Sequence, residues 1–216
     1  MSKAAQGNRE IHKDIREEND EFNKLWIAKN QLVGDDIVLA DELDVSLEVR
    51  LDASPFMVVW LKNIERLCEM FCSEFDCKSF SLLDVGCGSG IATFFFHQNY
   101  NFDGYGGFDF SSSLIGLANK NKKIIGKNGT DPSDILFEVG DAKKIKIPSK
   151  RYAIFMFNPF GWKTMNGFIS NNIEALRKNK SVILYANDIC IDNLLEFGSI
   201  VKRDDLFNLS VIAFGE

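Results

Sequence analysis

Residues 81–90 read SLLDVGCGSG, and this stretch decides how the rest of the chain folds. A short apolar run leads into Asp84, and glycines then occupy positions 86, 88 and 90. Glycine lets a ligand approach the backbone closely and adopts backbone angles that other residues avoid. The stretch therefore predicts a strand that ends in a tight, ligand-binding turn.

Two common ligands of glycine-rich turns do not match this one. In the dinucleotide fingerprint G-x-G-x-x-G, a count from Gly86 places the third glycine at position 91, which is an isoleucine. A Walker phosphate-binding loop needs Lys and then Ser or Thr after its last glycine, and this turn has neither. Asp84 is also unfavourable beside a phosphate, whereas it suits a ligand that carries a positive amino group.

Strand-like and helix-like segments alternate after residue 79. The strand-like runs cover residues 80–86, 103–110, 135–142, 152–161, 181–188, 197–203 and 207–216. Helical sequence over 90–100, 112–126 and 165–179 follows the first, second and fourth of them. This alternation predicts an α/β fold whose parallel sheet is covered on both faces. Because no helix fits between the last two runs, they are expected to form an antiparallel hairpin.

The N-terminal part is predicted to be mainly helical. Apolar residues recur at helical spacing over 9–30. A second helix is expected over 54–75, with Ser54 as its cap and Pro55 at its first position. Residues 42–52 fit both an alternating strand and a helix, so their structure is left open. We expect residues 1–75 to be an extension that covers the active site and residues 76–216 to be the main domain.

The turn LLDVGCGSG resembles motif I of the class I S-adenosylmethionine-dependent methyltransferases, which reads acid-x-Gly-x-Gly-x-Gly. That family places polar residues after several successive strands, and this chain has Asp109, Asp141 and Asn158 at such positions. The resemblance covers roughly residues 79–216. It implies a Rossmann-like, doubly wound sheet of seven strands, mostly parallel, with an antiparallel C-terminal hairpin.

The resemblance also implies a cofactor, S-adenosylmethionine, and the residues that hold it. Asp84 would lie near the amino group, and Asp109 would accept hydrogen bonds from the ribose hydroxyls. Asp141 and Ala142 would contact the adenine edge, and Phe110 its ring. The full cofactor-binding set that the resemblance implies is Asp84, Gly86, Cys87, Gly88, Gly90, Asp109, Phe110, Asp141, Ala142 and Asn158.

Residues 158–162 read NPFGW and are similar to the Asn-Pro-Pro-aromatic motif of amino-group methyltransferases. In that motif, the Asn and a backbone carbonyl accept hydrogen bonds from the target amine. Phe160 replaces the second proline here, which weakens the inference to a nucleobase or amide nitrogen. We expect Asn158 to contact the substrate and to take part in catalysis, with Phe160 and Trp162 as walls of the substrate pocket.

A general base is harder to identify. Asp188 ends the fifth strand-like run, at the expected rim of the pocket, and is the first candidate for deprotonating a hydroxyl. His12 is the second, because an N-terminal helix that folds over the pocket would bring it near the substrate. No metal site is expected, since Cys68, Cys72 and Cys77 lack a paired C-x-x-C and read as core cysteines.

Composition limits the partners. The chain has 216 residues and a formal net charge of −6, which counts against nucleic acid and anionic membranes as partners. No apolar run is long enough to span a membrane. The start MSKAAQGNRE shows no apolar signal segment and the five cysteines are an odd number, so we expect a cytoplasmic protein with reduced thiols. The sequence leaves the oligomeric state open.

These observations predict a methyltransferase that moves a methyl group from S-adenosylmethionine to a hydroxyl or amine of a small molecule, such as a sugar or sugar-nucleotide. One alternative is an N-methyltransferase that acts on nucleic acid or protein through the Asn-Pro-Phe motif. Another is a non-catalytic subunit that binds S-adenosylmethionine for a partner, which would account for the lack of a clear base.

Overall fold

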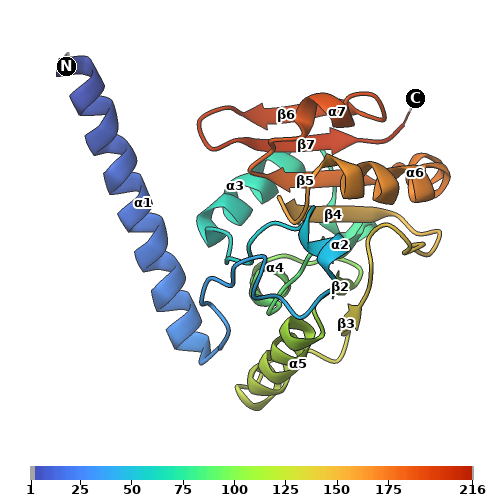
Figure 1. The fold of residues 1–216 in the computed structure, drawn as a ribbon, viewed down its shortest axis with the longest axis horizontal. Coiled ribbons are helices and arrows are strands. Elements are labelled where there is room, and N and C mark those ends of the chain that lie inside the picture. The colour runs from blue at the N-terminus through green and yellow to red at the C-terminus, as the bar shows by residue number, and fades with distance from the viewer. Residues whose placement is uncertain (1–2, 216) are drawn as a thin grey trace.

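The computed structural model describes the backbone of residues 3–215 and the side chains of residues 13–47 and 50–215. Within this part of the chain, seven strands form one sheet in the order β3-β2-β1-β4-β5-β7-β6 (Figure 1). They are β1 (Ser81–Val85), β2 (Tyr105–Asp109), β3 (Ile135–Val139), β4 (Tyr152–Phe157), β5 (Val182–Ala186), β6 (Ser199–Asp204) and β7 (Leu209–Ala213). The first five are parallel, and β7 runs antiparallel between β5 and β6. The expected doubly wound sheet with its antiparallel C-terminal hairpin is confirmed.

Helices cover both faces of the sheet. They are α1 (Lys3–Asn30), α2 (Leu47–Arg50), α3 (Leu61–Cys72), the short 3₁₀ helix η1 (Cys77–Ser79), α4 (Ile91–Asn99), α5 (Ser112–Lys127), α6 (Trp162–Lys178) and α7 (Ile191–Leu194). Buried side chains of α3, α4 and α5 share one hydrophobic cluster with the strands, and those of α6 and α7 share a second. In β4, Phe155 belongs to the first cluster and Met156 to the second. Because both faces are buried there, the inner strands β1, β4 and β5 read as nearly continuous apolar runs.

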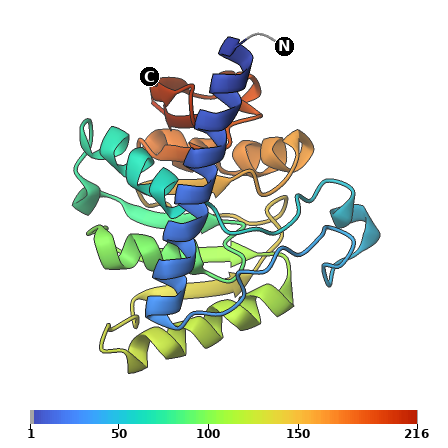
Figure 2. The same cartoon turned by 90° about the vertical axis from the view of Figure 1, so that its left-hand side faces the viewer.

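Helix α1 crosses one side of the molecule (Figure 2). The rings of Phe22 and Trp26 lie 6.3 and 5.3 Å from the ring of Phe95 in α4, measured between centroids. Asn23 accepts a hydrogen bond from the backbone N–H of Leu61 (2.9 Å), at the start of α3. These contacts attach the C-terminal half of α1 to the body of the protein.

One expected helix begins later than predicted. Residues 54–75 are helical only from Leu61, and the segment before it is extended. There, Phe56 pairs with Val38 in an antiparallel bridge. Ser54 caps no helix, and its backbone N–H donates instead to the loop after β4 (3.3 Å). Two adjacent β-branched valines also favour the extended backbone, and helical periodicity does not register such long-range pairs.

The remaining N-terminal residues form turns and one short helix. Residues 42–52, whose pattern fitted two structures, contain turns and the single-turn helix α2. Helix α3 packs against β5 and β7, so it forms part of the layered body. The division at residue 75 stays a prediction. Among residues 3–215, no helix combines the length and the apolar character that a membrane span requires.

Candidate functional site

The glycine turn connects β1 to α4, and its conformation requires glycine. Gly86, Gly88 and Gly90 have φ angles of +76°, +52° and +76°, which side-chain-bearing residues rarely adopt. The backbone N–H groups of Gly86 and Cys87 donate to the carbonyl of Phe108 (2.9 and 3.1 Å), which fixes the turn to β2. The turn is therefore held rigidly by the neighbouring strand.

Gly90 faces the protein interior, where only a residue without a side chain fits. A Cβ at this position would lie 2.7 Å from the ring of Phe137 and 3.2 Å from the side chain of Ala118. Gly90 is also the N-cap of α4. Its small size lets α4 pack closely on the body. Gly90 lines neither of the small cavities described below, and its role in cofactor binding stays a prediction.

Asp84 is a buried carboxyl at the end of β1. It is 2% exposed, and its Oδ2 accepts a hydrogen bond from Thr93 Oγ1 (2.7 Å) in α4. Burial raises the pKa of Asp84 to about 7; the hydrogen bond from Thr93 opposes this shift and the nearby charge of Asp109 adds to it. Without a cationic partner, Asp84 is thus only partly ionised at neutral pH.

Asp109 is a second buried carboxyl, at the end of β2 next to β1. Its Oδ2 accepts from the backbone N–H of Gly88 (3.0 Å), and its Oδ1 from that of Ser111 (2.9 Å). Burial raises the pKa of Asp109, while these backbone hydrogen bonds lower it. Each carboxylate oxygen can accept a further hydrogen bond, so Asp109 orders the turn and still has acceptors for a ligand.

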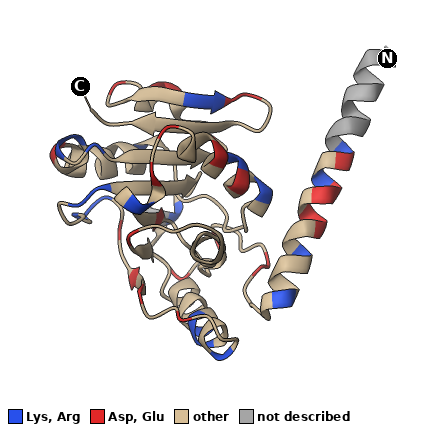
Figure 3. Cartoon of the chain, turned by 180° about the vertical axis from the view of Figure 1, so that it is seen from behind, with Lys and Arg blue, Asp and Glu red and all other residues tan. Residues whose placement is uncertain are grey.

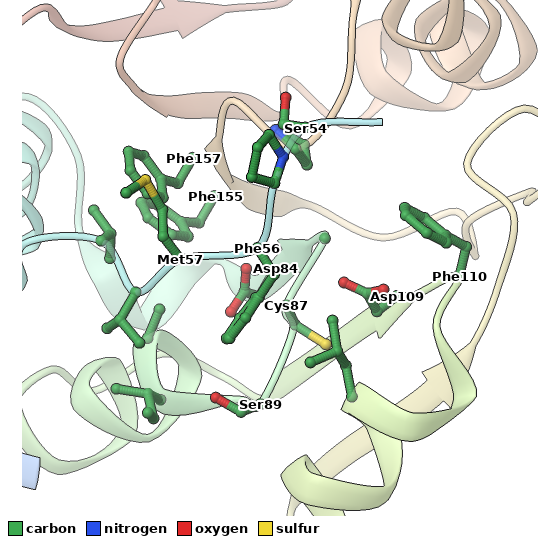
Figure 4. Close-up of a pocket in the computed structure, with 18 of the residues that line it drawn as sticks. Ser54, Phe56, Met57, Asp84, Cys87, Ser89, Asp109, Phe110, Phe155 and Phe157 are labelled. Carbon is green, nitrogen blue, oxygen red and sulfur yellow. The ribbon is translucent and has the colours of Figure 1, made fainter. Parts of the chain in front are cut away.

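Two small cavities follow the C-terminal ends of β1, β2 and β3. The first, of about 60 Å³, is lined by the predicted residues Asp84, Gly86, Cys87, Asp109 and Phe110 (Figure 4). The second, of about 20 Å³, is lined by the predicted residues Phe110, Asp141, Ala142 and Phe160. Phe110 borders both cavities. The structure therefore brings most of the predicted cofactor residues together along one edge of the sheet.

A segment from the N-terminal part fills much of this space. We call residues 52–57 the strap. The ring of Phe56 lies over Gly88 so closely that a Cβ there would collide with it, and Figure 4 shows Phe56 beside Asp84. Pro159 covers Gly86 in the same way. Pockets for small ligands usually have volumes of roughly 300–1,000 Å³, so the site is closed in this conformation.

The strap is attached to the segment that follows β4. The backbone carbonyl of Asp52 accepts from the N–H of Gly161 (2.8 Å). The Asp52 carboxylate accepts from the backbone N–H of Thr164 (2.8 Å) and from its hydroxyl, which caps the N-terminus of α6. Ala53 also forms a β-bridge with Phe160. Asp52 thus closes the strap over the site.

A second acid from the N-terminal part, Asp44, caps α5. Its carboxylate accepts from the hydroxyl of Ser112 (2.7 Å), from the backbone N–H of Ser113 (3.1 Å) and from the hydroxyl of Ser111. These bonds, led by that of Ser111 and opposed by desolvation, lower the pKa of Asp44 to about 2. Sequence reasoning missed Asp44 and Asp52, because each caps a helix more than 60 residues away and leaves no local signal.

Asn158 follows β4 in a left-handed conformation, with φ of +40°. Its Oδ1 is buried and has no hydrogen-bond partner among the described residues. Its chain neighbours Phe157 and Pro159 line the first cavity, although Asn158 itself does not. Trp162 packs against Phe197, with ring centroids 6.2 Å apart, and lines neither cavity. An unpaired buried acceptor at this position suits a donor group on a substrate.

The structure corrects the expectation that Asp188 lies at the pocket rim. Asp188 is 3% exposed; its carboxylate accepts from the hydroxyl of Ser210 and pairs with Nε of Arg203 (3.3 Å). It lines neither small cavity and instead joins the end of β5 to β6 and β7. His12 lies in α1, but its side chain is outside the described residues, so its role stays a prediction.

A larger groove of about 720 Å³ lies between α1 and the ends of β4 and β5. It adjoins the first cavity, since Met57 and Phe157 line both. Its other lining residues include Arg16, Trp60 and Asn187. Among the described side chains, no group of three or more His, Cys, Asp or Glu residues is arranged to hold a metal ion.

Solved structures share this architecture at low sequence identity. The ribosomal protein L11 methylase from Lactobacillus delbrueckii subsp. bulgaricus superposes with a TM-score of 0.50 at 14% identity, covering 70% of this chain and 77% of that one. The magnesium protoporphyrin IX methyltransferase ChlM from Synechocystis PCC 6803, solved with bound SAM, gives 0.51 at 12% identity, over 72% and 78%. The pyocyanin biosynthetic protein PhzM gives 0.53 at 14%, over 69% and 55%. No protein-family model and no curated protein sequence matches the chain.

Proposed function

The chain has the fold of the class I S-adenosylmethionine-dependent methyltransferases, and we propose that it transfers a methyl group from S-adenosylmethionine to a small molecule. One observation carries this proposal. Asp84 and Asp109 are buried at the C-terminal ends of adjacent parallel strands, on either side of a turn built from glycines with positive φ. Ligands of open α/β sheets bind at this end of the strands. No cation pairs with Asp84 among the described side chains, so a ligand's ammonium group would satisfy it.

The proposed donors would hold the parts of this cofactor in order along β1, β2 and β3. Asp84 would hold the ammonium group, and Asp109 would accept from the two ribose hydroxyls. Asp141 and Ala142, beyond β3, would border the adenine, with Phe110 against its ring. When bound, S-adenosylmethionine supplies an electrophilic methyl group on a sulfonium. The protein's part is to orient the acceptor toward that methyl group and to exclude water.

Binding requires the strap to move. In the closed conformation the ring of Phe56 occupies the side of Gly88 that the cofactor would contact. The strap is joined to the body mainly by hydrogen bonds and short bridges, which a segment of this length can break locally. We therefore propose that, within the N-terminal residues 1–75, the strap acts as a cover that closes over the site and opens to admit the cofactor, while α3 stays with the layered body.

The groove between α1 and the sheet is the proposed acceptor site. Its volume lies within the range of small-molecule pockets, and its lining is mainly apolar with a few polar groups. Asn158 would accept a hydrogen bond from the acceptor's amine or hydroxyl. Lys and Arg residues lie in several groups, among them α5, β6 and the loop between β3 and β4 (Figure 3). The formal net charge is nevertheless −6, which supports a small molecule over a nucleic acid as the substrate.

Two measurements test the proposal. Calorimetry with S-adenosylhomocysteine, the demethylated product, should show binding that Asp109→Ala weakens at least about tenfold, since the ribose would lose its acceptor. Transfer of label from S-adenosylmethionine to the small-molecule, RNA and protein fractions of a lysate then identifies the acceptor class. Label only in RNA or protein would favour the N-methyltransferase alternative. Tight binding without transfer would favour the non-catalytic subunit, and an absence of binding would refute the proposal as a whole.

A further inference from the structure

Cys72 and Cys77 lie together at the end of β1 that is opposite the glycine turn. Cys72 is the last residue of α3 and is exposed, and Cys77 is the first residue of η1 and is half-buried. Their Sγ atoms are 2.6 Å apart. Ordinary contacts between nonbonded heavy atoms are about 3.5–4.0 Å, and the bond in a disulfide is about 2.05 Å. The two sulfurs are thus closer to bonding distance than to a nonbonded contact.

Packing around the cysteines produces this proximity. The backbone N–H of Phe75 donates to the carbonyl of Phe71 (2.9 Å), which turns the chain back at the end of α3. The ring of Phe75 lies 5.2 Å from that of Phe71 and 5.7 Å from that of Phe80, between centroids. The carboxylate of Asp76 caps η1. Because the segment between the cysteines is folded onto buried aromatic rings, the two thiols face each other without a change of backbone.

The two thiols differ in access, and the other cysteines are sequestered. An oxidant in solution reaches Cys72 first, since Cys77 is less exposed. Burial, followed by the hydrogen bond with Cys72, raises the pKa of Cys77 to about 12, so Cys77 is a thiol in the reduced protein. Cys68, Cys87 and Cys190 are buried. The expectation that Cys72 belongs to the core is wrong, because it lies at the exposed C-terminus of its helix.

We propose that Cys72 and Cys77 are a redox-active dithiol, which a small-molecule disulfide such as oxidised glutathione converts into an intramolecular disulfide. The Cys72 thiolate attacks one sulfur of oxidised glutathione, forming a mixed disulfide and releasing one glutathione thiolate. Cys77 then loses its proton and attacks Sγ of Cys72, which forms the intramolecular bond and releases the second glutathione. The protein loses two protons and two electrons, and the oxidant is reduced to two molecules of glutathione.

The pair is independent of the proposed methyl transfer, because it touches none of the residues around the glycine turn. The bond would link the end of α3, which packs against β5 and β7, to the segment that leads into β1. It would thus connect two parts of the layered body at the surface. The site is a covalent modification site that responds to the thiol–disulfide balance of its surroundings.

The test uses the full-length protein in buffers with different ratios of oxidised to reduced glutathione. Free thiols are blocked with an alkylating reagent, and the intact mass and the peptide map are measured. The wild type should lose two hydrogens and yield a peptide in which Cys72 and Cys77 are linked. The variant Cys77→Ser should stop at one bound glutathione on Cys72. The variant Cys72→Ser should be oxidised at least about tenfold more slowly, because the accessible thiol is gone.

The control is Cys190→Ser, which removes a buried thiol from the opposite face of the sheet and should form the linked peptide as the wild type does. Wild-type protein that carries glutathione on either cysteine without an internal bond would overturn the proposal. A bond that includes Cys68, or no oxidation at any ratio, would overturn it equally. Peptide mapping of the wild type gives this answer even where a variant fails to fold.

Discussion

The ring of Phe56 lies against the backbone of Gly88, on the side of the glycine turn that faces the first cavity. A side chain at Gly88 would collide with this ring, so the contact depends on glycine. Phe56 also lines this cavity, whose volume is about 60 Å³. On the proposed function, the strap and the cofactor would compete for one space, and the balance between them would determine the apparent affinity.

Shortening Phe56 should shift this balance toward the ligand. In Phe56→Ala, the strap loses the apolar contact that keeps it over the turn. Full burial of a Phe side chain contributes roughly 1.5–3 kcal/mol, so the half-buried Phe56 contributes about 1.5 kcal/mol, and every 1.4 kcal/mol is a factor of ten in affinity. We expect S-adenosylhomocysteine to bind about tenfold or more tightly to Phe56→Ala than to the wild type, measured by calorimetry. The control is Phe197→Ala, which removes a ring that packs outside both small cavities and should leave the affinity unchanged. Weaker binding to Phe56→Ala would mean that the ring is part of the binding surface.

Gly88→Ala should destabilise the protein, because it adds a Cβ at a φ of +52° that would collide with the half-buried ring of Phe56. Left-handed backbone and overpacking together predict a loss of roughly 1–3 kcal/mol in the free energy of unfolding. The matched control is Gly116→Ala in α5, where a Cβ meets no atom within 4 Å. That substitution should be neutral or stabilise by up to about 1 kcal/mol. Combining Gly88→Ala with Phe56→Ala should recover part of the loss; strictly additive effects in denaturant unfolding would contradict the contact.

Because of Asp84, the free energy of unfolding should fall as pH rises. Its ordinary pKa is 3.8 and its pKa in the folded protein is about 7. The folded state thus keeps a proton that the unfolded chain releases, so the free energy of unfolding is highest below the lower pKa. It declines as pH rises between the two values and becomes level above about 7. The full change is about 4 kcal/mol, since each pKa unit corresponds to about 1.4 kcal/mol.

Urea unfolding of the wild type and of Asp84→Asn, from about pH 5 to about pH 8, measures this decline. The Asn variant should show a clearly smaller slope, because its side chain does not titrate. A ligand with an ammonium group has the opposite preference and stabilises the ionised carboxylate. The affinity for S-adenosylhomocysteine should therefore increase with pH up to about 7 in the wild type only. Equal slopes in the two proteins would place the titrating group elsewhere.

The sequence predicted the sheet and the carboxylate positions well, because these are local patterns. The apolar runs mark the strands, most of which are buried on both faces, and Asp84 and Asp109 lie at the C-terminal ends of two of them. This is the edge at which open α/β sheets bind ligands. Contacts between distant segments could not be read in this way. The pairing of Phe56 with Val38 and the capping of α6 by Asp52 depend on where the chain returns in space. The same limit explains the misplaced helix start and the missed strap.

Asn158→Gly should separate cofactor binding from chemistry. Glycine accepts the φ of +40° at this position without strain, so the substitution removes the side-chain amide and little else. If Oδ1 accepts a hydrogen bond from the substrate that receives the methyl group, kcat with the substrate found by labelling should fall by roughly a hundredfold. The affinity for S-adenosylhomocysteine should stay within about twofold of the wild type. A parallel loss of both would instead show that Asn158 supports the cofactor side of the site.

Asp52 and Asp44 offer a comparison of two similar caps with different consequences. Each carboxylate caps a helix N-terminus, Asp52 that of α6 and Asp44 that of α5, so either Ala substitution should cost about 1 kcal/mol of unfolding free energy. Only Asp52 belongs to the strap. Its removal should loosen the strap and raise the affinity for S-adenosylhomocysteine several-fold, whereas Asp44→Ala should lower stability without this gain. Removal of a residue with a purely structural role would reduce both stability and affinity. A lower stability together with a higher affinity in Asp52→Ala would therefore indicate that Asp52 closes the strap. Similar affinities for the two variants in calorimetry would show that Asp52 has no part in closure.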